Sequence, residues 1–154
     1  MRACTRYAIA KKDEDSGTSV LTREAGSDRA APTATIQLDG TYLESQFDTG
    51  HGETLLCLSD GSPYEAGLHV YLLADDNEIV DAIEGGAAYA AAIFKTRRVA
   101  DATLDFEFFT NAVVYQIKLL PQAKFRFSLP TGWKYKHRLR AHRLTLEALS
   151  TGKQ

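Results

Sequence analysis

The amino-acid sequence predicts a mainly β fold, either an antiparallel two-layer sandwich or a partly open barrel. The first observation is a period-two alternation of apolar and polar residues over positions 104–119, which is typical of half-buried strands. The second is a series of short extended runs, from residue 34 onward, separated by turn-forming residues. The third is size, because 154 residues with 44% hydrophobic side chains can bury a core without disulfide bonds.

Residues 104–119 give the clearest element, a β-hairpin. Each half places its apolar residues on one face, and Thr110-Asn111 supplies a turn between the halves. A slip of one residue would move the whole apolar set to the opposite face, so the pattern specifies the register. A two-residue loop predicts the cross-strand pairs Leu104–Ile117, Phe106–Tyr115 and Phe108–Val113.

The first 33 residues differ in composition from the rest of the chain. They are mostly polar or small, with a charged cluster at 11–15, and they contain no apolar stripe. Such a segment cannot bury enough apolar surface to fold by itself. We therefore predict a mobile N-terminal tail at residues 1–33, with a short strand at 20–22 as a weaker alternative, and a single β-rich domain at residues 34–150.

The other strands are predicted from runs that lie between turn signals. Asp39-Gly40 and the acidic segment 75–77 each separate two extended runs, which predicts two further hairpins. The run 68–73 is apolar on both faces, as expected for a strand in the middle of a sheet or between layers. The predicted strands are residues 35–38, 41–47, 53–59, 68–73, 78–83 and 124–129.

Two stretches allow more than one interpretation. The alanine-rich residues 85–92 favour a short helix by propensity, whereas Gly85-Gly86 favours an irregular crossing. Residues 133–141 alternate apolar or aromatic side chains with basic ones, which predicts a strand followed by a β-bulge at 141–143. The competing interpretation is a helix with one apolar face, formed by Tyr135, Leu139, His142, Leu146 and Leu149.

Cysteine content and hydropathy bear on the compartment. Cys4 lies in a polar stretch, and Cys57 lies between leucines, where a thiol is buried and inert. Two cysteines in these settings do not predict a disulfide framework. The longest nearly apolar run, residues 87–94, is shorter than the about 20 residues that span a bilayer. With no apolar segment of a secretory signal near the N-terminus, we expect a cytoplasmic protein that does not enter membranes.

Charge is segregated along the chain, although the formal net charge is only −2. Residues 39–84 contain eleven carboxylates and no Lys or Arg, and residues 121–154 contain eight basic residues and one carboxylate. The two regions could neutralise each other on one surface, or one of them could meet a protein partner. We expect a non-catalytic protein-binding module. The expected binding residues are Lys134, Lys136, Arg138 and Arg140.

Nucleic acid is a further alternative for the basic strand, but not the expected partner. Single-strand binders stack bases on aromatic side chains that lie beside basic ones. Here the alternation places Trp133 and Tyr135 on the face opposite Lys134 and Lys136. The carboxylates elsewhere would also repel phosphate groups.

The tetrapeptide Phe47-Asp48-Thr49-Gly50 follows one strand-like run and precedes another. It resembles the catalytic Asp-Thr-Gly corner of the aspartic proteases, in which two carboxylates share a proton and activate water. The resemblance covers four residues, and His51-Gly52 follows where the family usually has a small Ser or Ala. No second Asp-Thr/Ser-Gly is present, so only a homodimer could supply the second carboxylate. The competing interpretation is a turn in which Asp48 bonds its own backbone.

Other polar residues give weaker indications of a site. Asp48, His51 and Glu53 could form an acid–base cluster or a two-ligand metal site, which makes an Asp48-centred hydrolase the alternative function. His69 alternates with apolar neighbours and is interpreted as a satisfied or half-exposed strand residue, and His142 has no acidic neighbour in sequence. The segment 75–78 has oxygen ligands but lacks the loop of an EF-hand. We therefore predict no metal and no cofactor.

Overall fold

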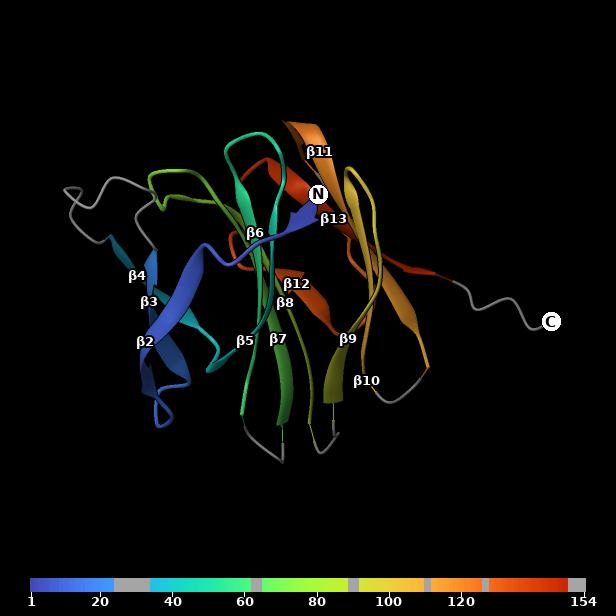
Figure 1. The fold of residues 1–154 in the computed structure, drawn as a ribbon. Helices are drawn as coiled ribbons and strands as arrows, with labels where there is room; N and C mark the ends of the chain where they lie inside the picture. Colours follow the sequence, from blue (N-terminus) through green and yellow to red (C-terminus); the bar gives the residue numbers. More distant parts are fainter. Residues whose placement is uncertain (24–33, 62–64, 89–91, 110–111, 126–127, 150–154) are drawn as a thin grey trace.

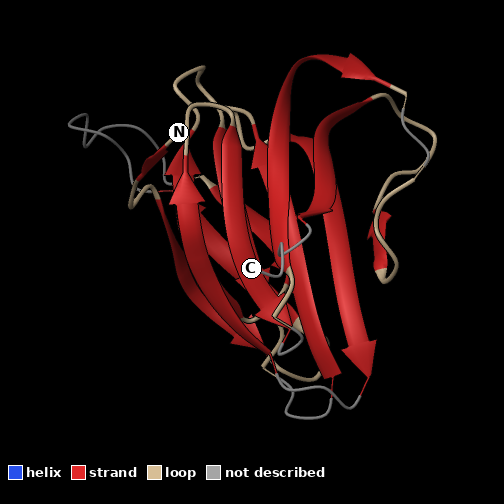
Figure 2. Cartoon of the chain, turned by 90° about the vertical axis from the view of Figure 1, so that its right-hand side faces the viewer, coloured by secondary structure: helices blue, strands red, loops and turns tan. Residues whose placement is uncertain are grey.

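The computed structural model describes residues 1–23, 34–61, 65–88, 92–109, 112–125 and 128–149, and every regular element in this part of the chain is a β-strand (Figures 1 and 2). The strands form three antiparallel sheets, none of which closes into a barrel. The predicted antiparallel β fold is therefore confirmed. The described residues contain no helix that is long and apolar enough to cross a membrane.

A six-stranded sheet lies in the middle of the molecule, with a smaller sheet on each side (Figure 1). Its strands, in spatial order, are β1 (Arg2–Ala3), β5 (Tyr42–Asp48), β6 (Thr54–Ser59), β7 (Glu65–Leu73), β8 (Ile79–Ala88) and β12 (Trp133–Tyr135). The four-stranded sheet has the order β13 (His142–Leu149), β11 (Val114–Lys124), β10 (Thr103–Phe109) and β9 (Ala92–Val99). The three-stranded sheet has the order β2 (Tyr7–Asp13), β3 (Thr18–Arg23) and β4 (Thr35–Asp39).

The predicted hairpin at 104–119 is formed by β10 and β11. Leu104 pairs with Ile117 and Phe106 pairs with Tyr115, as the alternation predicts. The turn residues 110–111 lie outside the described residues. The apolar face of this hairpin packs against the six-stranded sheet, where Phe106 and Ile117 are fully buried. Burial of each such side chain contributes about 1.5–3 kcal/mol.

Strand β7 is buried on both faces, as predicted. Its even-numbered apolar residues face the four-stranded sheet, and its odd-numbered residues Tyr71 and Leu73 face the three-stranded sheet. The six-stranded sheet therefore separates two hydrophobic cores. The hairpin prediction around residues 75–77 is also confirmed, since β7 and β8 pair directly through this turn.

The prediction of a mobile tail is wrong for residues 1–23. This segment contributes β1, β2 and β3, and it covers one face of the six-stranded sheet with the buried side chains of Tyr7 and Leu21. In this segment β1 buries no side chain, β2 buries only Tyr7, and β3 buries Ser19 and Leu21, so the sequence of the segment is mostly polar. Residues 24–33 lie outside the described residues.

Asp39-Gly40 does not close a hairpin, so the hairpin predicted at this turn is wrong. β4 pairs with β3 and β5 pairs with β6, so the chain moves from one sheet to another at this point. Gly40 has a φ of 104°, and a Cβ there would lie 2.6 Å from the Leu58 Cβ atom. Glycine is needed at this tight corner between two sheets. In the sequence, an Asp-Gly corner cannot be distinguished from an Asp-Gly hairpin turn.

Three further strand assignments differ from the predictions. The helix alternative near 85–92 is wrong for the described residues, because Gly85 and Gly86 lie inside β8 and the bare backbone of Gly85 packs under the Trp133 indole. Residues 133–141 are not one strand, since β12 ends at Tyr135 and the chain crosses to the four-stranded sheet before β13. Residues 136–141 form no helix, and the pairing of β13 with β11 has a register irregularity opposite His142–Leu144, with the extra residues between Leu119 and Lys124 of β11. In the run 124–129 the described residues Phe125, Ser128 and Leu129 are not in a strand, and 126–127 lie outside the described residues.

Candidate functional site

The structure does not bring together the predicted cluster at the Asp-Thr-Gly turn. Asp48 accepts a bond from the Gly50 N–H at 2.8 Å and pairs with Arg6 at 3.0 Å. The Gly50 bond is the main cause that lowers the pKa of Asp48; partial burial opposes the shift, and Arg6 reinforces it. Glu53 instead forms a two-point ion pair with Arg143, and the His51 side chain is exposed. These contacts agree with the interpretation of this segment as a turn in which Asp48 bonds its own backbone.

Of the four basic residues predicted to bind a partner, the two lysines form ion pairs and the two arginines are exposed. Lys134 lies 3.2 Å from Glu84, and Lys136 contacts both Asp39 and Glu84. Arg138 and Arg140 lie in the exposed crossing between β12 and β13. Acidic and basic regions of the sequence therefore neutralise each other in part, which is the first of the two explanations offered for the charge segregation.

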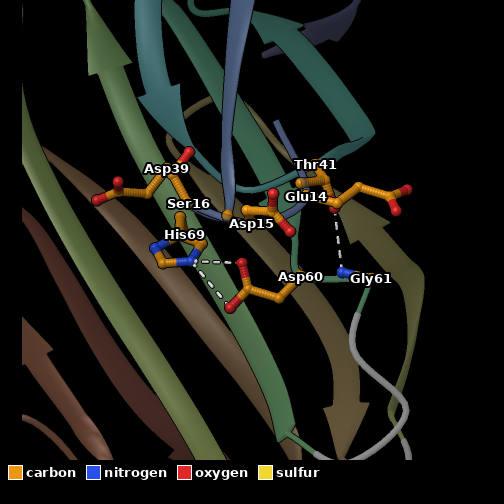
Figure 3. Close-up of a pocket in the computed structure, with 9 residues that line it drawn as sticks. Glu14, Asp15, Ser16, Asp39, Thr41, Asp60, Gly61 and His69 are labelled. Carbon is orange, nitrogen blue, oxygen red and sulfur yellow. Dashed lines mark hydrogen bonds and ion pairs between the residues drawn. The ribbon is translucent and has the colours of Figure 1, made fainter. Parts of the chain in front are cut away.

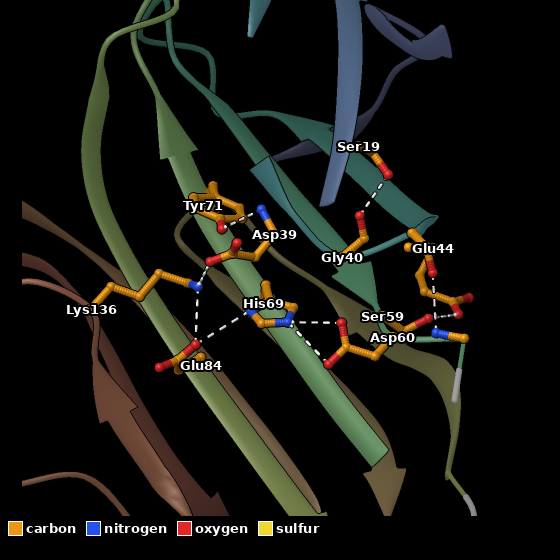
Figure 4. Close-up of polar contacts among 12 residues, drawn as sticks. Ser19, Asp39, Gly40, Glu44, Ser59, Asp60, His69, Tyr71, Glu84 and Lys136 are labelled. Atoms are coloured by element: carbon orange, nitrogen blue, oxygen red, sulfur yellow. Dashed lines mark hydrogen bonds and ion pairs between the residues drawn. The ribbon is translucent and has the colours of Figure 1, made fainter. Parts of the chain in front are cut away.

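A polar network centred on His69 lies where the three-stranded sheet meets the six-stranded sheet (Figure 4). His69 is in β7, its cross-strand neighbour Glu84 is in β8, and Asp60 directly follows β6. The His69 Nε2 atom lies 3.0 Å and 3.2 Å from the two Asp60 carboxylate oxygens. The Nδ1 atom lies 3.4 Å from Glu84 Oε2. One imidazole thus faces carboxylates on both sides.

Lys136 joins this network to the three-stranded sheet. Its ammonium lies 2.7 Å from Asp39 Oδ2 and 3.0 Å from Glu84 Oε2. Burial alone would lower the pKa of Lys136, but its bonds to Asp39 and Glu84 and the nearby Tyr71 raise the pKa. The bond from Lys136 lowers the pKa of Asp39. Burial opposes ionisation of Glu84, but Lys136 and Lys134 outweigh it and lower the pKa of Glu84 as well.

An open acidic pocket of about 460 Å³ borders the network (Figure 3). The exposed turn between β2 and β3 forms one wall with Glu14 and Asp15, and Asp60 and His69 form the opposite side. Asp39 is the fourth carboxylate. Among these, Asp39 is paired with a lysine and Asp60 with an imidazole. The field inside the pocket is therefore negative.

A second hollow, of about 620 Å³, lies on the other side of His69 and Asp60. Its lining includes Gly67, Gly85 and Gly86 as well as Lys134 and Arg138. At Gly67 a Cβ would lie 2.0 Å from an Asp60 oxygen, so the glycine makes room for that carboxylate. His69 and Asp60 are shared by both hollows.

Another aspartate–histidine pair is sealed inside the molecule. His142 in β13 is 1% exposed, and its Nδ1 atom lies 3.1 Å from Oδ1 of Asp81 in β8. Asp81 also accepts bonds from the backbone N–H groups of Ala82, Arg143 and Leu144. The pair joins the six-stranded sheet to the four-stranded sheet, so the acidic partner that His142 lacks in its sequence neighbourhood comes from 61 positions away.

The two cysteines differ in burial, with Cys4 partly exposed and Cys57 buried. The Cys57 thiol is fully buried, as expected, and burial raises its pKa to about 12. Cys4 and Cys57 are both free cysteines.

The network around His69 can hold a cation, through ion pairs and charge-assisted hydrogen bonds.

Sequence reasoning missed the roles of Asp60, His69 and Glu84 because they are close only in the fold. One signal was present: His69 and Asp81 are polar residues inside apolar runs. A buried polar group needs a partner, so such an interruption indicates a contact elsewhere in the chain. The pattern does not say which residue supplies the contact.

The chain matches no protein-family model, and no curated protein or solved structure shows significant similarity to it.

Proposed function

We propose that the chain is a non-catalytic module that binds a protein partner by taking a Lys or Arg side chain of that partner into the acidic pocket. The observation that carries this proposal is the convergence of Glu14, Asp15, Asp39 and Asp60 on one open pocket. A pocket lined by one sign of charge concentrates the opposite charge and steers its approach. The proposal keeps the expectation of a protein partner but moves the contact from the basic to the acidic surface.

The location of the carboxylates supports a binding role over a structural one. Glu14 and Asp15 stand on an exposed turn, and no described Lys or Arg forms an ion pair with either. On the basic side, by contrast, Lys134 and Lys136 are already engaged by Glu84. A cationic group entering the acidic pocket would therefore break fewer existing contacts than an anionic group approaching the basic side.

The alternatives have less support. For a hydrolase, Asp48 would have to share a proton or act as a base, but its contacts with Gly50 and Arg6 lower its pKa, which disfavours proton sharing and makes the carboxylate a weaker base. For nucleic acid, Lys134 and Lys136 would have to leave their carboxylates. Trp133 is also only 7% exposed, so it offers no face for stacking a base.

A peptide titration tests the proposed function. The probes are a tri-arginine peptide and a tri-glutamine peptide of equal length, and the readout is the shift of backbone amide signals in NMR spectra. We expect the tri-arginine peptide to shift Ser16, Gly17 and Gly61, which line the pocket, and its affinity to fall as salt is raised. Equal shifts with both peptides, or shifts only outside the pocket, would contradict the proposal.

Matched variants locate the effect. Glu14→Gln with Asp15→Asn should weaken tri-arginine binding about fivefold to tenfold, since each exposed ion pair contributes about 0.2–1 kcal/mol. The control is Glu147→Gln, because Glu147 is an exposed carboxylate in β13 of the four-stranded sheet. An equal loss in the control would assign the binding to net charge rather than to the pocket.

A further inference from the structure

Three side chains from three strands bring donor atoms to one point beside the acidic pocket. Asp39 ends β4, His69 lies in β7 and Glu84 lies in β8. One carboxylate oxygen of each acid and one imidazole nitrogen all lie within 4.8 Å of one another. In the part of the chain that the structure describes, this is the one group of three carboxylate or imidazole side chains so placed.

The His69 ring provides a second observation that points to a bound cation. The residue is 9% exposed, and its buried Nδ1 atom has no hydrogen-bond partner. The Nε2 atom faces both oxygens of Asp60, which leaves Nδ1 as the ring nitrogen available to a cation. The Nδ1 atom lies 3.4 Å from Glu84 Oε2, so a cation placed beside them would contact an imidazole nitrogen and a carboxylate oxygen together.

Lys136 supplies positive charge at this point. Its ammonium contacts Asp39 Oδ2 and Glu84 Oε2, which are two of the three candidate ligand groups (Figure 4). An ammonium can satisfy the carboxylates, but the structure records no bond from it to His69 Nδ1. A metal ion could bind all three donors at once, because its coordination positions are not limited to three N–H directions.

We propose that Asp39, His69 and Glu84 form a site for a divalent transition-metal ion of the Zn²⁺ class, in which the ion takes the place of the Lys136 ammonium. One imidazole and two carboxylates suit Zn²⁺, whereas Ca²⁺ and Mg²⁺ prefer oxygen ligands only. Three protein ligands leave a fourth position for water or a partner group, as in open zinc sites. The bond from His69 to Asp60 is the outer contact that commonly fixes a metal-binding imidazole.

The site is accessible to ions from solvent. Asp39 and His69 both line the acidic pocket, whose negative field attracts cations. The Lys136 side chain is 12% exposed, and the Asp39 side chain beside it is 53% exposed. A turn of the lysine toward solvent would leave the three donors in place, since each is held by a different strand.

Metal titration of the full chain tests the proposal. The probe is Zn²⁺ alone, in competition with a chromogenic chelator, with Co²⁺ absorption as a second readout of coordination. We expect one equivalent to bind, with a perturbed His69 ring signal in NMR spectra. Lys136→Met should bind Zn²⁺ about tenfold more tightly or better, because the charged hydrogen bonds that compete with the metal are lost.

Ligand variants and a control complete the test. His69→Ala should weaken Zn²⁺ binding more than about tenfold, and Asp60→Asn should weaken it about 10- to 100-fold through the outer contact. His51→Ala, which removes an exposed histidine outside the cluster, should bind as the parent does. Circular dichroism establishes that each variant is folded. If His69→Ala fails to fold, Asp60→Asn and Glu84→Gln give the same information.

The outcomes that overturn the proposal are specific. They are failure of both the parent chain and Lys136→Met to bind one equivalent, or equal affinity of the parent and the folded ligand variants. The titration contains no peptide, so its failure leaves the proposed peptide binding untouched. Failure of the tri-arginine titration would likewise leave the metal result standing.

Discussion

Asp81–His142 and Asp60–His69 have the same chemistry but different surroundings. His142 and Asp81 are 1% and 4% exposed, and they lie between two sheets. His69 and Asp60 lie between two hollows that open to solvent, and the Asp60 side chain is 32% exposed. The first pair is enclosed by the fold, and the second is accessible to ligands.

The backbone hydrogen bonds of the two aspartates distinguish a structural Asp–His pair from a candidate binding pair. Asp81 accepts bonds from three backbone N–H groups and also contacts His142, so the fold depends on its two carboxyl oxygens. Among the described residues, the Asp60 carboxylate bonds His69 and no backbone donor. A carboxylate that satisfies no backbone group can be changed without leaving buried N–H groups unpaired.

The largest effect is expected at the enclosed pair. Asp81→Ala should lower the free energy of unfolding by about 3–5 kcal/mol, because it leaves a buried imidazole and several backbone donors without their acceptor. Urea unfolding followed by circular dichroism measures the change. A loss below about 1 kcal/mol would mean that the two pairs do not differ in the way described.

A smaller effect is expected from pH, and it arises in the open region. The pKa values of Asp39 and Glu84 are lowered, so their stabilising contribution is present above the ordinary carboxyl range and is lost as pH falls. The raised pKa of Lys136 means that its contribution persists through neutral pH and is lost only in strong base. Stability should therefore fall between about pH 5 and pH 1.

The matched variant for this pH effect is Lys136→Met. Without the ammonium, the two carboxylates lose the partner that lowers their pKa values, so the acid fall should be shallower by about 1 kcal/mol after allowance for solvent exposure. Unfolding free energies at a series of pH values test this. An acid fall that is unchanged in Lys136→Met would assign the pH dependence to other carboxylates.

The smallest effect on stability is expected at the open pair. Asp60→Asn should change the free energy of unfolding by about 0.5 kcal/mol, the scale of a partly exposed ion pair. The same urea experiment applies, with Asp81→Ala as the comparison. A loss as large as that of Asp81→Ala would show that Asp60 is a structural residue and would weaken its assignment to a binding pocket.

The parts of the fold that could be predicted depend on local patterns. Phe106 and Tyr115 are paired as expected because alternation and turn position both specify one register. The apolar character of both faces of β7 correctly placed it between layers. The change of sheet at Gly40 could not be predicted in this way, because a corner and a hairpin turn use the same residues.

The candidate site was less predictable than the fold. His142 and Asp81 are 61 positions apart, and Lys136 and Asp39 are 97 positions apart, so sequence neighbours gave no indication of either pair. The basic face assigned to a continuous strand ended at Tyr135 because the chain crosses between sheets there. Complementary charge in the two regions indicated that contacts could form, but not which carboxylate would meet which lysine.

The double coverage of the six-stranded sheet has a practical consequence for dissecting the molecule. A shortened protein without β2, β3 and β4 would expose to water the surface formed by Leu56, Leu58, Tyr71 and Leu73, which is otherwise covered. An apolar surface of that kind promotes self-association. Truncation from the N-terminal side would therefore produce aggregates rather than a smaller stable unit, and would remove Glu14 and Asp15 in the same step.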